Sequence, residues 1–244
     1  MADTRKFMTG LVGVAAPYWA GEAEIVRSYF SRPRTLERDL LWLKAQAFKE
    51  TRHLRILPAD KREEFWRTGT VADHPEGPEA GRKFAEEMKH FRLLSDLIAE
   101  LIGAPVTMAD LVELPQETEL QAMRAPYRAG GELDQAIVNF TEGGGGAIYW
   151  VLARIEGGEL ERRIAHAFRV IYEDEVIHGP GEIHTIARHA TSAQDWRRAE
   201  RIVEMICRQR LHMRNEMFGF PLSGARIREI GEGEIEPWEM PIPI

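Results

Sequence analysis

Two short stretches of the sequence repeat one pattern of charged residues. Residues 86–90 and residues 174–178 both read acid, Glu, two further residues and His. In a helix, a Glu and a His three residues apart lie on one face, so a carboxylate oxygen and an imidazole nitrogen can reach the same metal ion. Two such pairs suit a bundle of four helices that holds two metals, provided that each of the other two helices adds one inward Glu.

Hydrophobic periodicity supplies both of the missing glutamates. Apolar residues at alternating steps of three and four predict long helices over about residues 35–57, 84–102, 138–156 and 159–190. Each helix carries one acid on its apolar stripe, and these acids are Glu50, Glu87, Glu142 and Glu175. Unpaired carboxylates buried there would be costly, whereas two divalent metals would neutralise four carboxylates and accept two imidazoles, those of His90 and His178. The alternative is that the stripes are misphased and these acids face solvent.

The other segments complete the predicted architecture, which is all-α. A long connection crosses from the second to the third helix of the bundle, with only short helical segments such as 109–114. A short connecting helix is expected over residues 60–67, and an additional C-terminal helix begins at Ser192. Glycine and proline at 179–181 predict a kink just after His178.

We expect one domain over residues 1–244, with the core bundle at about 35–190. Glycine and proline within residues 1–34 predict a loosely ordered arm, with a short helix over 22–30. The extra helix and an extended tail, which starts at residue 231, occupy residues 191–244.

Composition limits the classes of partner. The formal net charge of −7 disfavours nucleic acid and anionic lipid as partners, and no apolar run approaches the length of a membrane span. The single cysteine, Cys207, excludes a disulfide framework and a thiolate iron–sulfur site made by this chain alone, so a reducing cytoplasm is the expected location. A small organic molecule is the expected ligand, and a homodimer is compatible with the sequence.

The ordered set of acids and histidines resembles the ferritin-like di-iron carboxylate superfamily. That superfamily includes the ribonucleotide reductase small subunit, bacterial multicomponent monooxygenases and aldehyde-deformylating oxygenases. The resemblance covers about residues 35–190 and includes the long crossover between the second and third core helices. It implies a ferritin-like four-helix bundle with two iron ions, with manganese as an alternative metal.

The resemblance also implies a role for each residue of the set. Glu87 and Glu175 would bridge the two metals, Glu50 with His90 would complete one metal site, and Glu142 with His178 would complete the other. Two acids stand directly before the motifs, where the family has a carboxylate that holds a ligand histidine in its metal-binding tautomer. These acids are Glu86 and Asp174.

Further polar residues lie one helical turn from the predicted ligands. Glu182 follows His178, and His53 follows Glu50. Each is either an extra ligand or proton relay, or simply a polar group that reaches solvent.

Four consecutive glycines follow Glu142, and they are Gly143, Gly144, Gly145 and Gly146. Glycine inside a helix costs about 1 kcal/mol per residue relative to alanine, so the run suggests that the backbone leaves space for a substrate beside the metals. Tyr149 and Tyr172 flank this predicted cavity.

The resemblance implies an oxygen-activating non-haem di-iron oxidase or oxygenase. Its reaction would be hydroxylation, N-oxygenation, desaturation or C–C cleavage of a small organic substrate, with dioxygen as co-substrate. Electrons would come from a separate donor protein or from the substrate, because the sequence has no flavin or nicotinamide fingerprint. A manganese catalase, a tRNA-modifying hydroxylase of the same superfamily and a non-catalytic helical interaction module remain alternatives.

Overall fold

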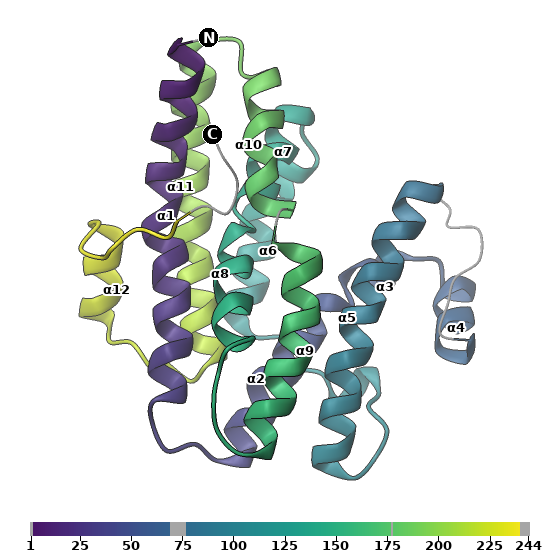
Figure 1. The fold of residues 1–244 in the computed structure, drawn as a ribbon. Coiled ribbons are helices and arrows are strands. Elements are labelled where there is room, and N and C mark those ends of the chain that lie inside the picture. The colour runs from purple at the N-terminus through teal and green to yellow at the C-terminus, as the bar shows by residue number, and fades with distance from the viewer. Residues whose placement is uncertain (1, 69–76, 177, 240–244) are drawn as a thin grey trace. The chain divides into compact units, whose positions relative to one another are not determined.

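The structure is a computed structural model that describes residues 2–68, 77–176 and 178–239. Every regular element among these residues is helical (Figure 1). The elements are α1 (Ala2–Phe30), α2 (Leu36–Glu50), α3 (Arg52–Ile56), α4 (Ala59–Thr68), α5 (Pro78–Ile102), the 3-10 helix η1 (Met108–Asp110), α6 (Pro115–Arg128), α7 (Glu132–Phe140), α8 (Gly143–Leu152), α9 (Glu159–Glu175), α10 (His178–His189), α11 (Ala193–Met217) and α12 (Gly224–Gly231). None of the described helices combines the length and the apolar character that a membrane span requires.

The helices form two compact units. Unit 1 consists of residues 1–34 and 114–244, and unit 2 consists of residues 35–113. Unit 2 is therefore inserted between two segments of unit 1 in the sequence. The interpretation of the whole chain as one domain stays a prediction, as does the ferritin-like arrangement of four core helices.

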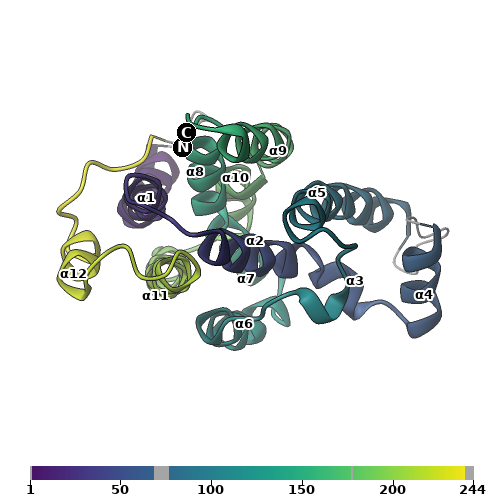
Figure 2. The same cartoon turned by 90° about the horizontal axis from the view of Figure 1, so that it is seen from below.

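The N-terminal segment is a 29-residue helix, α1, so the prediction of a loose arm is wrong. Its side chains Leu11, Trp19 and Val26 are fully buried, because α1 packs on α11 and α8 (Figures 1 and 2). A Cβ at Gly21 would lie 2.8 Å from Ile230 Cγ2, so this glycine allows a close approach. Tertiary burial outweighs the low helix propensity of the glycines in this segment.

The predicted third long helix is divided into α7 and α8. The two helices meet at residues 141–142, where Thr141 Oγ1 donates a 2.6 Å hydrogen bond to the carbonyl of Val138. α7 packs against α10, and α8 packs against α1 and α9.

The predicted fourth helix is divided into α9 and α10, and the division precedes His178 instead of following it. Pro180 has no N–H to give the carbonyl of Val176, and its ring would clash with that carbonyl in a continuous helix. The chain therefore leaves the helix after Glu175. A Cβ at Gly179 would lie 2.4 Å from the backbone N of Gly143, so the start of α10 touches the start of α8.

The long connection contains a helix that the prediction missed. Residues 115–128 form α6, with Pro115 in its first turn, where proline is favoured. Pro115 therefore marks the start of a helix within this connection. α6 packs on α11, whose predicted start is confirmed by a capping box between Ser192 and Asp195.

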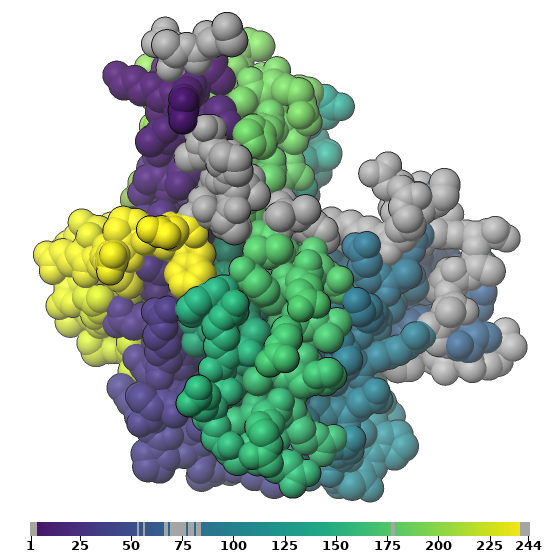
Figure 3. All heavy atoms as spheres, in the orientation of Figure 1, coloured from purple at the N-terminus to yellow at the C-terminus, as the bar shows by residue number. Residues whose placement is uncertain are grey.

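The C-terminal residues fold back onto unit 1. After α12, which was not predicted, residues 232–239 follow without helix or strand, and the backbone N–H of Trp238 donates a 3.2 Å hydrogen bond to the carbonyl of Ala16. Figure 3 shows this yellow segment lying across α1. Residues 240–244 of the predicted tail lie outside the described residues.

Unit 2 is built on α2 and α5, which pack together. Thr35 caps α2, and the helix predicted over residues 35–57 is interrupted at Thr51, between α2 and α3. α5 buries Phe84, Phe91 and Leu94 and ends at Gly103, whose φ of 71° confirms the predicted glycine stop. The connecting helix predicted over residues 60–67 is also confirmed, as α4.

Candidate metal centre and buried polar network

Three of the predicted ligands meet inside unit 2. Glu50 is the last residue of α2, and Glu87 and His90 lie on α5 one turn apart. One ligand atom from each of these side chains lies within 4.8 Å of the others, and this is the one such group found among the described residues. The distance from His90 Nδ1 to Glu50 Oε2 is 3.7 Å.

The group is shielded from solvent. His90 is fully buried and Glu50 is 6% exposed, while Glu87 is partly buried. Gln46 Nε2, one turn before Glu50 on α2, donates a 2.5 Å hydrogen bond to Glu50 Oε1. That bond fixes one carboxylate oxygen, and the other oxygen is the one nearest the imidazole.

Contacts keep Glu50 in the form that binds metals. Burial by itself raises the pKa of the Glu50 carboxyl, but the interactions with His90, Gln46 and Glu87 outweigh burial and hold that pKa below its usual range. Two carboxylates and one imidazole are a donor set that suits iron, manganese or zinc. The residues present therefore fit a divalent transition metal.

The predicted partners of these ligands lie in the other unit. Glu142 stands at the junction of α7 and α8, with its side chain 39% exposed, and Glu175 is the last residue of α9. His178 begins α10, so the break at Val176 separates it from Glu175, and the two do not share one continuous helix as predicted. The side chain of His178 lies outside the described residues. A six-ligand centre that joins both units stays a prediction.

The role of the two acids expected to orient the histidines stays a prediction. Glu86 is exposed on α5, and Asp174 is partly exposed near the end of α9. The side chain of His53, an expected extra ligand or relay, lies outside the described residues. Glu182 accepts a 3.3 Å hydrogen bond from Asn139 Nδ2 within unit 1, which fits the simpler reading of a partnered polar group.

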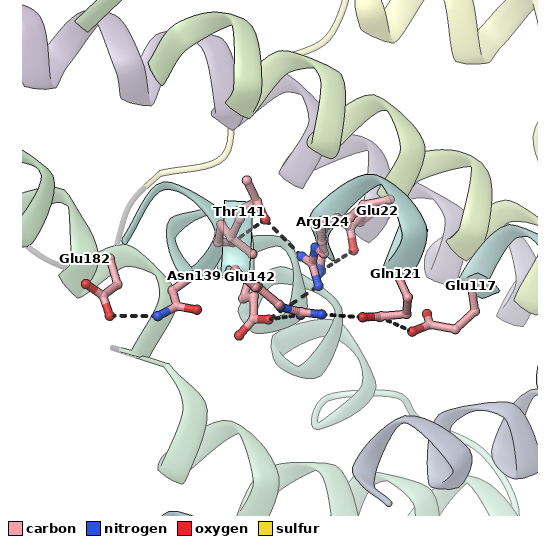
Figure 4. A network of polar contacts seen from close by, with 11 residues as sticks. Glu22, Glu117, Gln121, Arg124, Asn139, Thr141, Glu142 and Glu182 are labelled. Carbon is pink, nitrogen blue, oxygen red and sulfur yellow. Dashed lines mark hydrogen bonds and ion pairs between the residues drawn. The ribbon is translucent and has the colours of Figure 1, made fainter. Parts of the chain in front are cut away.

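Glu142 belongs to a network of polar contacts in unit 1 (Figure 4). Its Oε1 lies 3.4 Å from Arg124 Nη1 and 3.8 Å from Arg128 Nη2. Arg124 is 2% exposed and also donates a 2.9 Å hydrogen bond to Thr141 Oγ1. Through Gln121 the contacts continue to the buried Glu117. Burial lowers the pKa of Arg124 to about 9, although the nearby Glu142 carboxylate opposes that effect.

A second buried ion cluster was not predicted. Arg210 donates hydrogen bonds of 2.9 and 3.1 Å to the two oxygens of Glu22, and Arg214 donates one of 3.3 Å. Burial lowers the pKa of Arg210, but the Glu22 carboxylate outweighs burial and raises it above its ordinary value. The signal in the sequence was the pair of arginines four residues apart on the apolar face of α11.

The four glycines of α8 have different surroundings. A Cβ at Gly143 would lie 2.6 Å from the ring of Trp19, and one at Gly144 would lie 2.1 Å from Glu22 Oε1. These two glycines let α8 approach α1. A Cβ at Gly145 would make an ordinary 3.5 Å contact with Tyr149, and one at Gly146 would meet nothing within 4 Å.

Unit 1 contains a pocket of about 550 Å³ that includes part of the predicted substrate cavity. Gly143, Gly146 and Tyr172 line it, whereas Gly144, Gly145 and Tyr149 do not line it. The ring of Tyr149 packs on Phe168 instead, with 5.7 Å between the centroids. The glycine run therefore serves helix packing at one point and opens a pocket at another.

A function for this chain has to be inferred from the geometry of these sites. In comparisons with protein families, curated proteins and solved structures, nothing matches this chain. The described residues form an all-helical protein in which the group of Glu50, Glu87 and His90 could hold a metal ion.

Proposed function

We propose that this chain is a metal-dependent oxidoreductase of the ferritin-like di-iron carboxylate type, which uses dioxygen to oxidise a small organic molecule. The observation that supports it is the convergence of Glu50, Glu87 and His90 in the interior of unit 2. Two carboxylates and one imidazole that converge in a largely buried place form a donor set for a divalent metal, and the metal would balance the negative charge of the acids.

Each residue of the group has a definite task in this proposal. Glu50 and Glu87 supply the negative charge that holds the metal, and His90 supplies a neutral nitrogen donor. Gln46 orients Glu50 through its hydrogen bond. Iron, when bound, supplies the redox chemistry with dioxygen that no amino-acid side chain provides.

The full proposal adds a second metal held by Glu142, Glu175 and His178. For Glu142 to bind this metal, its carboxylate must give up its contacts with Arg124 and Arg128. Electrons beyond those of the metals come from a separate donor protein or from the substrate.

Metal analysis of protein purified from iron-supplemented culture tests the proposal. We expect two iron ions per chain and consumption of dioxygen after ferrous loading under anaerobic conditions. Glu87→Gln should lose metal, whereas Glu100→Gln, an exposed acid on the same helix, should retain it.

The other outcomes separate the alternatives. One metal per chain would limit the metal centre to Glu50, Glu87 and His90 of unit 2. The absence of any bound metal would overturn the proposal. Bound manganese together with rapid release of dioxygen from hydrogen peroxide would replace it with a catalase.

A further inference from the structure

The pocket of unit 1 has a wall made by the C-terminal segment. Its floor is built by α1 and α8, and α9 and the start of α10 contribute Tyr172 and Pro180. Trp238 is fixed twice in the opposite wall, by the backbone hydrogen bond to Ala16 and by its ring, whose centroid lies 5.7 Å from that of Trp150. Figure 3 shows this segment reaching from α1 towards α8 and α9.

Four aromatic residues contribute to the lining of the pocket, and two of their rings stand at a steep angle to one another. Trp19, Trp150, Tyr172 and Trp238 all line it, and the planes of Trp150 and Trp238 meet at 78°. Rings set at steep angles around one space are the arrangement that binds organic cations, because each ring offers the negative region of its π system.

Two of these rings already accept a cation of the protein itself. The guanidinium carbon of Arg154 lies 4.3 Å from the Trp150 centroid and 5.6 Å from the Tyr172 centroid. Both distances fall within the range of about 6 Å over which a cation is attracted to a ring.

Among the charged residues that line the pocket, carboxylates outnumber cations. Three carboxylates, those of Glu24, Glu236 and Glu239, line it together with one guanidinium, that of Arg27. Arg226 neutralises Glu24 through two 2.8 Å hydrogen bonds. Glu236 and Glu239 are exposed on the C-terminal segment and leave this side of the pocket acidic.

We infer that the pocket of unit 1 binds a small organic cation with an apolar body, such as an aryl or alkyl ammonium ion. The aromatic rings and the side chains of Pro180 and Pro237 receive the body, and the carboxylates of Glu236 and Glu239 attract the charge. None of the lining residues is a proposed metal ligand, so the inference is tested on metal-free protein, separately from the proposed oxidoreductase function.

Isothermal titration of metal-free protein tests the inference with three probes that share a phenyl ring. They are benzyltrimethylammonium, benzyl alcohol and benzoate, which carry positive, zero and negative charge. We expect the cation to bind roughly tenfold more tightly than the neutral probe, and the anion to bind least. Equal binding of all three, or tighter binding of benzoate, would overturn the cationic assignment. No binding of any probe would overturn the site.

Variants locate the binding. Gly146→Leu should abolish it by filling the pocket, and it should leave the fold intact because a Cβ at Gly146 meets nothing within 4 Å. Gly13→Leu, at an exposed helical glycine that also has open space, is the matched control and should bind as the parent does. A Gly146→Leu protein with parental thermal stability and parental affinity would show that the ligand sits elsewhere.

Further variants test whether the carboxylates of Glu236 and Glu239 attract the cation. Replacement of both Glu236 and Glu239 by Gln should weaken benzyltrimethylammonium several-fold and leave benzyl alcohol unchanged. Glu234→Gln, in the same segment but outside the pocket, should change neither. An unchanged affinity in the double variant would show that these two carboxylates do not contribute to binding.

Discussion

Glu22 lies between two arginines in the interior of unit 1. Its carboxylate is fully buried, and the side chains of Arg210 and Arg214 are only 3% and 1% exposed. Two cations thus share one anion in a place that water does not reach. Removing one member of such a cluster leaves buried charge without compensation.

We therefore expect Glu22→Gln to lower the free energy of unfolding by about 3–5 kcal/mol. Glu24→Gln is the matched control, because Glu24 is also on α1 and also accepts two hydrogen bonds from one arginine, but is partly exposed. The control should cost about 1 kcal/mol or less. Urea denaturation of both variants makes the comparison, and equal losses would contradict the role of burial.

Cys207 gives a prediction about pH. Burial raises the pKa of its thiol to about 12, while an unfolded cysteine ionises near about 8.5. Because the folded pKa is the higher one, this contribution to stability is complete below about pH 8.5 and is lost as the pH rises towards 12. The thiol should not react with a disulfide reagent at pH 8 until denaturant is added. Rapid labelling of the native protein would contradict the burial, and Cys207→Ala should lessen the loss of stability above pH 8.5.

At the scale of residues, the sequence predicted that Glu50, Glu87 and His90 come together, and the structure has them close to one another. Glu50 and Glu87 were predictable because each lies on a regular apolar stripe, and His90 was predictable from its spacing of three residues after Glu87. The pairing of Glu142 with Arg124 was not predictable, because Arg124 lies in a segment that was expected to be loop and its burial depends on contacts with α7 and α11.

Among the elements, α8 shows how a glycine run can be read two ways. Propensity predicts that every glycine in a helix weakens it, but the glycines that face α1 cannot be replaced without a clash. The face that each glycine occupies decides the sign of the effect.

We expect Gly144→Ala to destabilise the protein by about 1–3 kcal/mol, because its Cβ would lie 2.1 Å from Glu22 Oε1. Gly145→Ala should instead stabilise it by up to about 1 kcal/mol, since its Cβ would make an ordinary contact. Thermal unfolding of the two variants measures the difference. Stabilisation by both would show that α1 and α8 are farther apart than described.

Helix ends were predicted better than helix interruptions. Gly103 and the pair Ser192 and Asp195 are local signals, and the structure has both ends where these residues predict them. The breaks at Thr141 and before Pro180 were missed or misplaced, because an unbroken apolar rhythm continues across them. Residues 179–181 predict a kink just after His178, but Pro180 acts on the carbonyl four residues earlier, so the helix ends before His178.

At the scale of the whole molecule, the division into two units leads to a prediction about where metal binding stabilises the chain. A ligand that binds only the folded state at a concentration of 100 times Kd stabilises that state by about 2.7 kcal/mol. Metal held by Glu50, Glu87 and His90 should therefore slow amide hydrogen exchange in α2 and α5 of unit 2. Hydrogen–deuterium exchange with and without ferrous iron measures this, and additional protection in α8, α9 and α10 would support a centre that includes Glu142 and Glu175. Protection confined to α1 and α11 would contradict the site.

The division into units is also where prediction from sequence was weakest. Local pattern cannot reveal that α1 is buried, since the side chains that cover it belong to α8 and α11, more than a hundred residues further along the chain. An alternation of glycine and apolar residues then looks like a flexible arm.

That separation governs the order of events when the chain is made. α1 leaves the ribosome before α11, which begins at Ala193 and at typical synthesis rates follows roughly ten to thirty seconds later. Residues 35–113 are synthesised within that interval, and they include all the contacts within unit 2. The Trp19 and Val26 face of α1 meanwhile stays exposed. Nascent chains of this protein should therefore depend on a chaperone at their N-terminal end, and the waiting time is set by translation and not by the intrinsic speed of folding.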